Sequence, residues 1–271
     1  MLGYVAPVGF ALFLWWFSTG VVILLDGLPR RTFRWSMLGA SVTALLGLAA
    51  AYAFRAETTA LAAYVGFAAG LLIWAWHEMS FLMGYVTGPR RTPCPPGARG
   101  WRRFAYASET VIHHELAIAA TAAALAAAIW GAPNQAALWT FVALWVMRLS
   151  AKLNVFLGVP NLTDEFMPER LHYLKSYFAV KPMNLLFPLS VTGATGASAI
   201  LFTLSYGASP FEQAMFALIG ALLALAALEH WFMVLPVRDA ALWRWALAMR
   251  ARLKNQPPTP KSQLFVQTAK A

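Results

Sequence analysis

The sequence predicts an all-α, polytopic membrane protein with seven transmembrane helices, its N-terminus periplasmic and its C-terminus cytoplasmic. Three observations support this fold class. Hydrophobic residues make up 60% of the 271 residues and charged residues only 12%, which is about half the charged share of a soluble globular protein. The apolar residues form seven runs, each long enough to cross a bilayer. The basic residues fall almost entirely between alternate runs.

A membrane span needs about 20 mostly apolar residues, and seven segments meet this requirement. The predicted spans are Val5–Leu25, Ser36–Phe54, Leu61–Tyr85, Ala107–Trp130, Ala136–Leu157, Asn184–Leu204 and Phe211–Leu235. Short turns at Gly131–Gln135 and Ser205–Pro210 make the spans on either side antiparallel neighbours. Residues 1–254 therefore form one predicted membrane domain, and residues 255–271 are predicted to be a disordered cytoplasmic tail.

The positive charges determine the predicted orientation. With the N-terminus in the periplasm, all of the 21 Lys and Arg residues except Arg55 lie in cytoplasmic segments or in the cytoplasmic halves of spans. Adding or removing one span would destroy this alternation. We therefore expect a multi-pass protein of the bacterial inner or intracytoplasmic membrane, surrounded by the lipid bilayer. Because the basic residues lie between apolar runs and not on a soluble basic face, nucleic acid is not an expected partner.

Two segments outside the spans are predicted to lie along the membrane surface. Met167–Phe178 has Pro168 in its first turn and carries one apolar stripe at helical spacing. The side chains of this stripe are Met167, Leu171, Leu174 and Phe178. Arg238–Lys254 mixes apolar and cationic side chains, and is predicted to be either a second surface helix or a continuation of the last span.

Ionisable residues inside spans are costly, so each needs a partner or a role. The alternating directions of the spans place most such residues here in the cytoplasmic halves, and this shared depth predicts one cluster formed by four spans. The candidates are His77 and Glu78 in the third span, Glu109, His113, His114 and Glu115 in the fourth, Arg148 and Lys152 in the fifth beside the polar Asn154, and Glu229 and His230 in the seventh.

A metal site is the first interpretation of the cluster, because imidazole and carboxylate ligands suit iron, zinc or manganese. Glu109 and His113 are four residues apart and share a helix face, and His77 and His230 would complete the set from neighbouring spans. The predicted ligands are His77, Glu78, Glu109, His113, His114, Glu115, Glu229 and His230. The sequence lacks the His-x-x-His and His-x-x-x-His pairs of membrane desaturases and hydroxylases.

A tetrapyrrole or quinone pocket is the second interpretation, in which a histidine ligates the central metal of a chlorophyll-type ring and a cation holds a propionate or a quinone carbonyl. The predicted cofactor-binding residues are His77, His113, His114, His230, Arg148 and Lys152. The aromatic side chains near them are Trp74, Trp76, Phe81 and Trp231. In the third interpretation the charged residues only pair and fasten helices. The residues alone do not decide among the three, or whether the chain is catalytic.

Six short motifs occur in order along the chain. They are Trp76-His77-Glu78, Ile112-His113-His114-Glu115-Leu116, Ser150-Ala151-Lys152-Leu153-Asn154, Leu157-Gly158-Val159-Pro160-Asn161, Ser176-Tyr177-Phe178 and Glu229-His230-Trp231-Phe232. Taken together, they resemble the photosynthetic complex assembly protein 2 family (PuhE) of purple phototrophic bacteria. The resemblance covers nearly the whole chain, from the first span to Arg250.

This resemblance implies a membrane assembly factor that acts in biogenesis of the reaction centre and light-harvesting complex, or in their bacteriochlorophyll supply. The implied partners are the reaction centre, light-harvesting subunits or pigment-synthesis enzymes, and no site residue is implied. The alternative, which comes from the residues themselves, is an intramembrane metalloenzyme or a tetrapyrrole- or quinone-binding enzyme that uses the His/Glu cluster.

Overall fold

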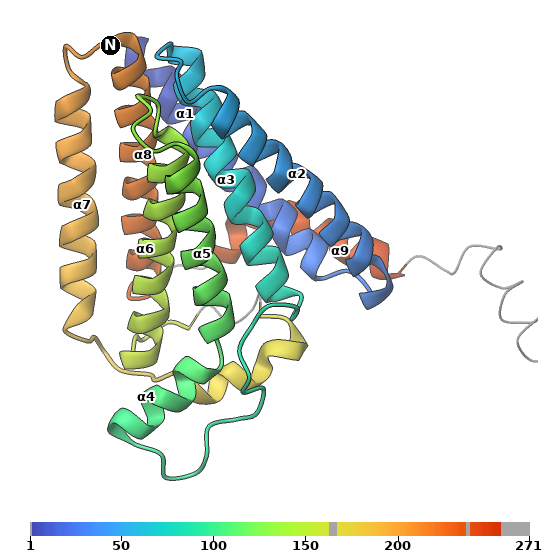
Figure 1. Cartoon of the computed structure of the whole chain (residues 1–271). Helices are drawn as coiled ribbons and strands as arrows, with labels where there is room; N and C mark the ends of the chain where they lie inside the picture. The colour runs from blue at the N-terminus through green and yellow to red at the C-terminus, as the bar shows by residue number, and fades with distance from the viewer. Residues whose placement is uncertain (1, 163–166, 237–238, 256–271) are drawn as a thin grey trace, which may run out of the picture.

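The computed structural model describes residues 2–162, 167–236 and 239–255, and within these ranges every regular element is a helix (Figure 1). The α-helices are α1 (Leu2–Asp26), α2 (Phe33–Ala53), α3 (Ala60–Leu82), α4 (Gly100–Glu109), α5 (Ile112–Ala128), α6 (Ala136–Leu157), α7 (Leu186–Ser205), α8 (Pro210–Phe232) and α9 (Arg244–Asn255). Short 3₁₀ helices are η1 (Arg30–Thr32), η2 (Glu169–Tyr177) and η3 (Asp239–Trp243).

Six of these helices are long and apolar enough to cross a membrane by themselves, and they match six of the seven predicted spans. They are α1, α2 with η1, α3, α6, α7 and α8. The bent pair of α4 and α5 would make a seventh span. The chain is thus a multi-pass helical membrane protein by the length and composition of its helices.

The fourth predicted span, Ala107–Trp130, is not one continuous helix, and this prediction is corrected. α4 and α5 meet at an angle of 64°. The cause is the preceding loop, whose backbone forms hydrogen bonds with groups of α4 and α5 that would form intrahelical bonds in a continuous helix. The amide of Arg90 donates to the carbonyl of Glu109 at 3.2 Å, and the amide of His114 donates to the carbonyl of Thr87 at 2.8 Å. In an unbroken helix both groups would pair within the helix.

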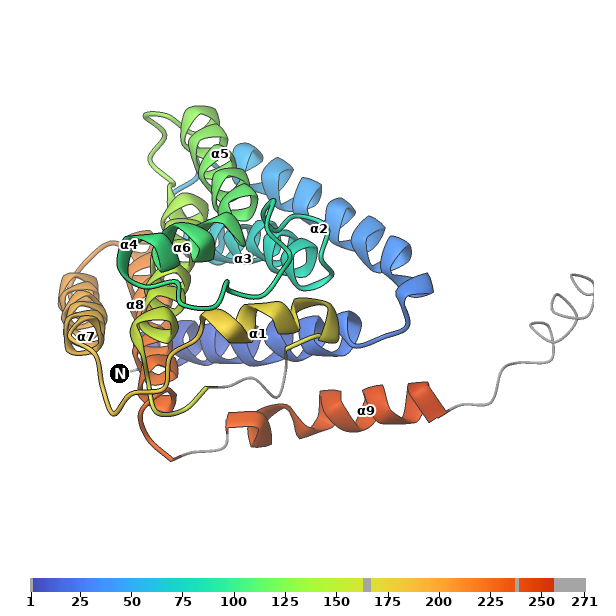
Figure 2. The same ribbon diagram turned by 90° about the horizontal axis from the view of Figure 1, so that it is seen from below.

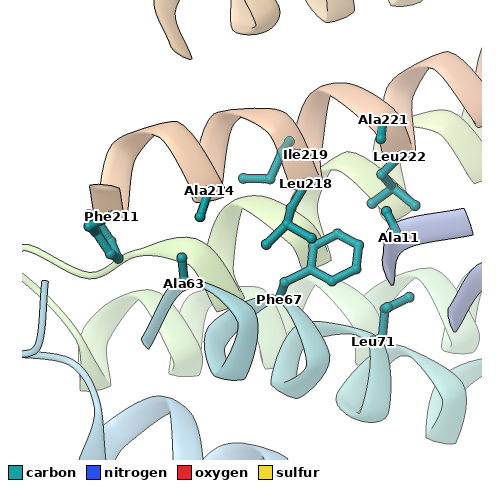
Figure 3. Close-up of a cluster of buried hydrophobic side chains, with 10 residues drawn as sticks. All are labelled: Ala11, Ala63, Phe67, Leu71, Phe211, Ala214, Leu218, Ile219, Ala221 and Leu222. Atoms are coloured by element: carbon teal, nitrogen blue, oxygen red, sulfur yellow. The ribbon is translucent and has the colours of Figure 1, made fainter. Parts of the chain in front are cut away.

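The centre of the bundle is formed by α3 and α8. Within the 18-residue apolar stretch of each helix, 56% of α3 and 61% of α8 is buried, compared with 17–22% in the other four single spans. Phe67 of α3 is fully buried and packs with Leu218 of α8 in the largest cluster of apolar side chains (Figure 3). Ala63 and Ala214 belong to the same cluster, and their small side chains let the two backbones approach closely.

Gly70 of α3 lies against α6 with no room for a side chain. A Cβ atom there would be 2.7 Å from the carbonyl oxygen of Ala137 and 2.8 Å from Cβ of Thr140. We expect Gly70→Leu to lower the free energy of unfolding in mixed micelles by about 1–3 kcal/mol, because α3 must move away from α6. Gly39→Leu on α2 is the matched control, since a Cβ at Gly39 would meet nothing within 4 Å. An equal loss in both variants would contradict the prediction.

The segment predicted as an amphipathic surface helix, Met167–Phe178, is the 3₁₀ helix η2. Its buried side chains are Leu171, Leu174 and Tyr177, which recur every three residues, as the three-residue turn of a 3₁₀ helix requires. Leu171 and Leu174 pack on Phe81 of α3. The apolar side of η2 therefore covers one end of the bundle, which we call the η2 end.

The segment after α8 turns back and runs beside α1 as η3 and α9 (Figure 2). The indole N–H of Trp243 donates to the carbonyl of Trp16 at 3.0 Å, and the indole N–H of Trp16 donates to the carbonyl of Leu242 at 2.8 Å. Of the two predictions for Arg238–Lys254, a separate helix is thus confirmed and a continuation of the last span is wrong. The predicted tail beyond residue 255 lies outside the described residues.

Candidate functional site

The ionisable residues named above as site candidates lie at one end of the bundle, as their depth predicted. They occupy the last turns of α3 and α8, the first turn of α5 and the second half of α6, all toward the η2 end (Figure 1). They do not form one cluster, however. They divide into a network of ion pairs, a hydrogen-bonded network around His230, and several residues that belong to neither.

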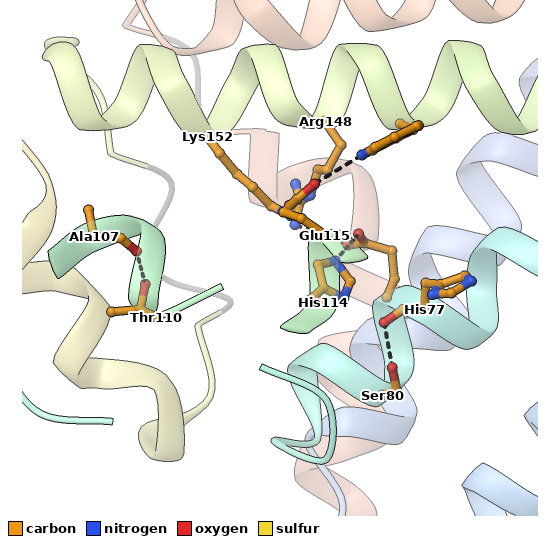
Figure 4. Close-up of polar contacts among 10 residues, drawn as sticks. His77, Ser80, Ala107, Thr110, His114, Glu115, Arg148 and Lys152 are labelled. Carbon is orange, nitrogen blue, oxygen red and sulfur yellow. Dashed lines mark hydrogen bonds and ion pairs between the residues drawn. The ribbon is translucent and has the colours of Figure 1, made fainter. Parts of the chain in front are cut away.

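Two ion pairs connect α6 to α3 and α5 (Figure 4). Arg148 and Lys152 are four residues apart on one face of α6. The Arg148 guanidinium lies 3.1 Å from Oε2 of Glu78, and the Lys152 ammonium lies 2.6 Å from Oε1 of Glu115. The second carboxylate oxygen of Glu115 accepts the indole N–H of Trp145 at 2.9 Å. Each cation thus meets a carboxylate from a different neighbouring helix, and the four charges balance.

His114 lies beside the ion pairs and is fully buried. Its ring is 4.6 Å from that of Phe81, centroid to centroid, and its Nε2 is 4.0 Å from Oε1 of Glu78. This distance is too long for a hydrogen bond, and neither ring nitrogen has a hydrogen-bond partner in the part of the chain that the structure describes. His77 faces the same region, with its Nε2 3.1 Å from the Thr121 hydroxyl.

His230 belongs to a second network on another side of α6. Its Nδ1 lies 2.8 Å from the carbonyl of Ala226 and must donate, because a carbonyl only accepts. Its Nε2 is 2.9 Å from the Ser150 hydroxyl, which contacts the Ser190 hydroxyl at 2.8 Å. The side-chain amide of Asn154 donates to Ser190 at 3.1 Å. The network joins α6, α7 and α8.

Three of the predicted site residues lie apart from both networks. Glu109 ends α4 and pairs with Arg90 of the loop at 2.7 Å. His113 is exposed on the outer side of α5. Glu229 accepts the indole N–H of Trp15 at 2.8 Å, between α8 and α1. The argument that Glu109 and His113 share one helix face is wrong, because the break between α4 and α5 separates them.

The predicted metal ligands are therefore not assembled. Among the described residues, no group of three or more His, Cys, Asp or Glu side chains is placed to hold a metal ion. His77, His113, His114 and His230 do not face one common point, since His113 is exposed and His230 bonds to hydroxyls across α6. Metal binding stays a prediction, without an assembled site in these residues.

A cavity of about 590 Å³ lies at the η2 end between α1, α3, α6 and α8. The predicted site residues that line it are Glu78, Glu115, Arg148, Lys152, Glu229 and His230. Of the aromatic residues named as stacking partners, Trp74 and Phe81 line the cavity. Trp76 instead donates to the Ser41 hydroxyl on α2, and Trp231 packs on Phe187.

Arg170 of η2, which no sequence pattern singles out, holds η2 against the end of the bundle where this cavity lies. Its guanidinium donates to the carbonyl of Leu82 at 2.6 Å and to the carbonyl of Asp26 at 2.7 Å. It also lies over the ring of Phe33, 4.4 Å from the centroid. Burial lowers the pKa of Arg170 from its usual value, and Asp26 opposes this effect. One side chain thus connects η2 to the ends of α1 and α3.

The fold and these contacts define a multi-pass helical membrane protein with ion pairs, buried histidines and a cavity at one end of its bundle. The chain belongs to the DUF3623 family, described as "Protein of unknown function", whose model matches residues 1–254. It is 38% identical over 242 residues to a Rhodobacter capsulatus protein described as "Uncharacterized 30.4 kDa protein in puhA 5′ region", covering 87% of this chain and 88% of the relative. No solved structure matches the chain.

Proposed function

We propose that this chain is a membrane assembly factor in biogenesis of the photosynthetic reaction centre and light-harvesting complex, or in their bacteriochlorophyll supply. The observation that carries the proposal is the relative in the 5′ region of puhA, in a photosynthesis gene cluster. The alignment covers more than four fifths of both chains, so the similarity extends over most of each protein and is not confined to one segment. The motifs that resemble the PuhE family point to the same process.

The apolar outer surface of the helix bundle is compatible with contacts to other membrane proteins within the bilayer. Its charged residues pair with one another within the bundle, and its outer helices present large apolar side chains. The partners in this proposal are the reaction centre, light-harvesting subunits or pigment-synthesis enzymes of a bacterial inner or intracytoplasmic membrane.

The test is an in-frame deletion of the relative's gene in Rhodobacter capsulatus, with this chain supplied from a plasmid. We expect the deletion to lower the near-infrared absorption of the membranes and the amount of reaction-centre subunits, and this chain to restore both. Because the gene lies beside puhA, puhA transcript must be measured in parallel. Unchanged complexes in a deletion strain with a normal puhA transcript would overturn the proposal.

Pigment extraction from the same strains separates the two forms of the proposal. A role in assembly predicts that bacteriochlorophyll is still made and that unassembled subunits are degraded. A role in pigment supply predicts a fall in total bacteriochlorophyll before the subunits disappear. A time course after induction of photosynthetic growth, with pigments measured by chromatography and subunits by immunoblot, distinguishes them.

A further inference from the structure

The cavity at the η2 end is lined by residues of both α3 and α8. The two helices are in contact at the core cluster and diverge toward η2 (Figure 1). α1, α4, α5 and α6 also contribute lining residues, as do Leu171 and Leu174 of η2. The volume of about 590 Å³ falls within the range of about 300–1,000 Å³ that is typical of small-molecule sites.

Most of the cavity wall is apolar. Its two cations are both on α6, and its four carboxylates come from α1, α3, α5 and α8, namely Asp26, Glu78, Glu115 and Glu229. Trp15, Leu71, Trp74 and Leu222 are among the apolar lining residues. On the polar side, the Lys152 ammonium contacts Glu115 at 2.6 Å and lies 5.3 Å from the centroid of the Phe81 ring, and its side chain is 22% exposed.

Arg148 is different, because it faces the cavity with most of its donors available. Its side chain is 44% exposed although it belongs to the middle of a span. A guanidinium has five N–H donors, and within the described ranges its one polar contact is Oε2 of Glu78. A cation at this depth is costly unless polar groups surround it. A fork of N–H donors at an apolar cavity is the arrangement that recognises a carboxylate.

We propose that this cavity binds one membrane-soluble molecule that has an apolar body and a carboxylate end, with the carboxylate held by Arg148. Two kinds of molecule share this chemistry, a free fatty acid and a tetrapyrrole that carries a propionate. The proposal goes beyond the role in photosynthetic complexes and does not depend on it. Because it is tested on purified protein, its failure would leave the genetic test of that role unaffected.

The test is binding of two probes to the full chain in lipid nanodiscs. Radiolabelled oleate represents the chain-shaped acids and protoporphyrin IX represents the ring-shaped acids, and cetyltrimethylammonium serves as a competitor with the opposite charge. We expect saturable binding of at least one acid, which the cationic amphiphile does not displace. The acid that binds more tightly identifies the source of the ligand.

Two variants report on the two halves of the site. Arg148→Gln is expected to weaken binding by about tenfold or more, as loss of a charge-assisted hydrogen bond predicts. Ala75→Phe should weaken binding with the ion pairs intact, because Ala75 lines the cavity and a larger side chain would occupy part of it. The matched controls are Arg31→Gln and Ala49→Phe, since both residues are exposed outside the cavity.

The variants must first be shown to fold, by their unfolding temperature and their elution as a single species. If Arg148→Gln does not fold, the double variant Glu78→Gln/Arg148→Gln replaces it, since this variant leaves no charge of the pair unpaired. Binding in Ala75→Phe, or in the variant without Arg148, that is as tight as in the unaltered chain would overturn the proposal. Absence of saturable binding for both acids would overturn it as well.

Discussion

Replacing Glu115 with leucine is expected to lower the free energy of unfolding by about 3–5 kcal/mol, because it leaves a charge unpaired inside the bundle. Both carboxylate oxygens of Glu115 accept hydrogen bonds. One accepts from the Lys152 ammonium at 2.6 Å and the other from the indole N–H of Trp145 at 2.9 Å. The side chains of Glu115 and Lys152 are 15% and 22% exposed, so water cannot fully replace the lost carboxylate. The measurement is reversible unfolding in mixed micelles.

A second substitution and a second ion pair serve as controls for this result. The double variant Glu115→Leu/Lys152→Met is expected to regain most of the lost free energy, because it removes both charges together. The pair Arg90–Glu109 has a similar distance of 2.7 Å, but its carboxylate is 46% exposed, so Glu109→Leu should cost about 1 kcal/mol or less. If Glu115→Leu lowered the free energy of unfolding by no more than Glu109→Leu, the prediction that the buried ion pair matters more for stability than the exposed one would be wrong.

Most of the span pattern could be predicted from the sequence because the bilayer limits length and composition together. The six spans that form single helices were predicted to within a few residues at most of their ends. The break between α4 and α5 could not be predicted, because its cause is tertiary. It depends on loop residues Thr87 and Arg90, whose backbones bond to His114 and Glu109, and nothing in the local sequence reveals that contact.

The depth of the candidate site was predictable, but the direction of each side chain was not. Depth follows from position along a span and from the alternation of spans. Direction depends on rotation about the helix axis, which changes by about 100° per residue. His113 and His114 are therefore neighbours in sequence, yet one is exposed and the other is fully buried. Ser190 was not named, and Ser150 was named only as part of a family motif, because hydroxyl residues are ordinary components of membrane helices.

A reporter fused to the C-terminus is expected to lie in the cytoplasm. The reason is the positive-inside rule, since every basic residue except Arg55 falls on one side of the predicted topology. Green fluorescent protein at this position should fluoresce, and alkaline phosphatase should be inactive. The same phosphatase inserted at Gly207, in the turn between α7 and α8, should be active. The opposite result at both sites would reverse the orientation.

A third insertion, in the turn at residues 131–135, tests whether α5 crosses the membrane. The amide of Asn134 in this turn donates to the carbonyl of Arg55, and its side-chain amide donates to the carbonyl of Phe54. The turn therefore lies beside the end of α2, at the end of the bundle away from η2. Active phosphatase in this turn, together with the result at Gly207, would establish seven spans. It would also place the ion pairs, the cavity and η2 on the cytoplasmic side, so that a carboxylate held by Arg148 would enter from the inner leaflet or from the cytoplasm.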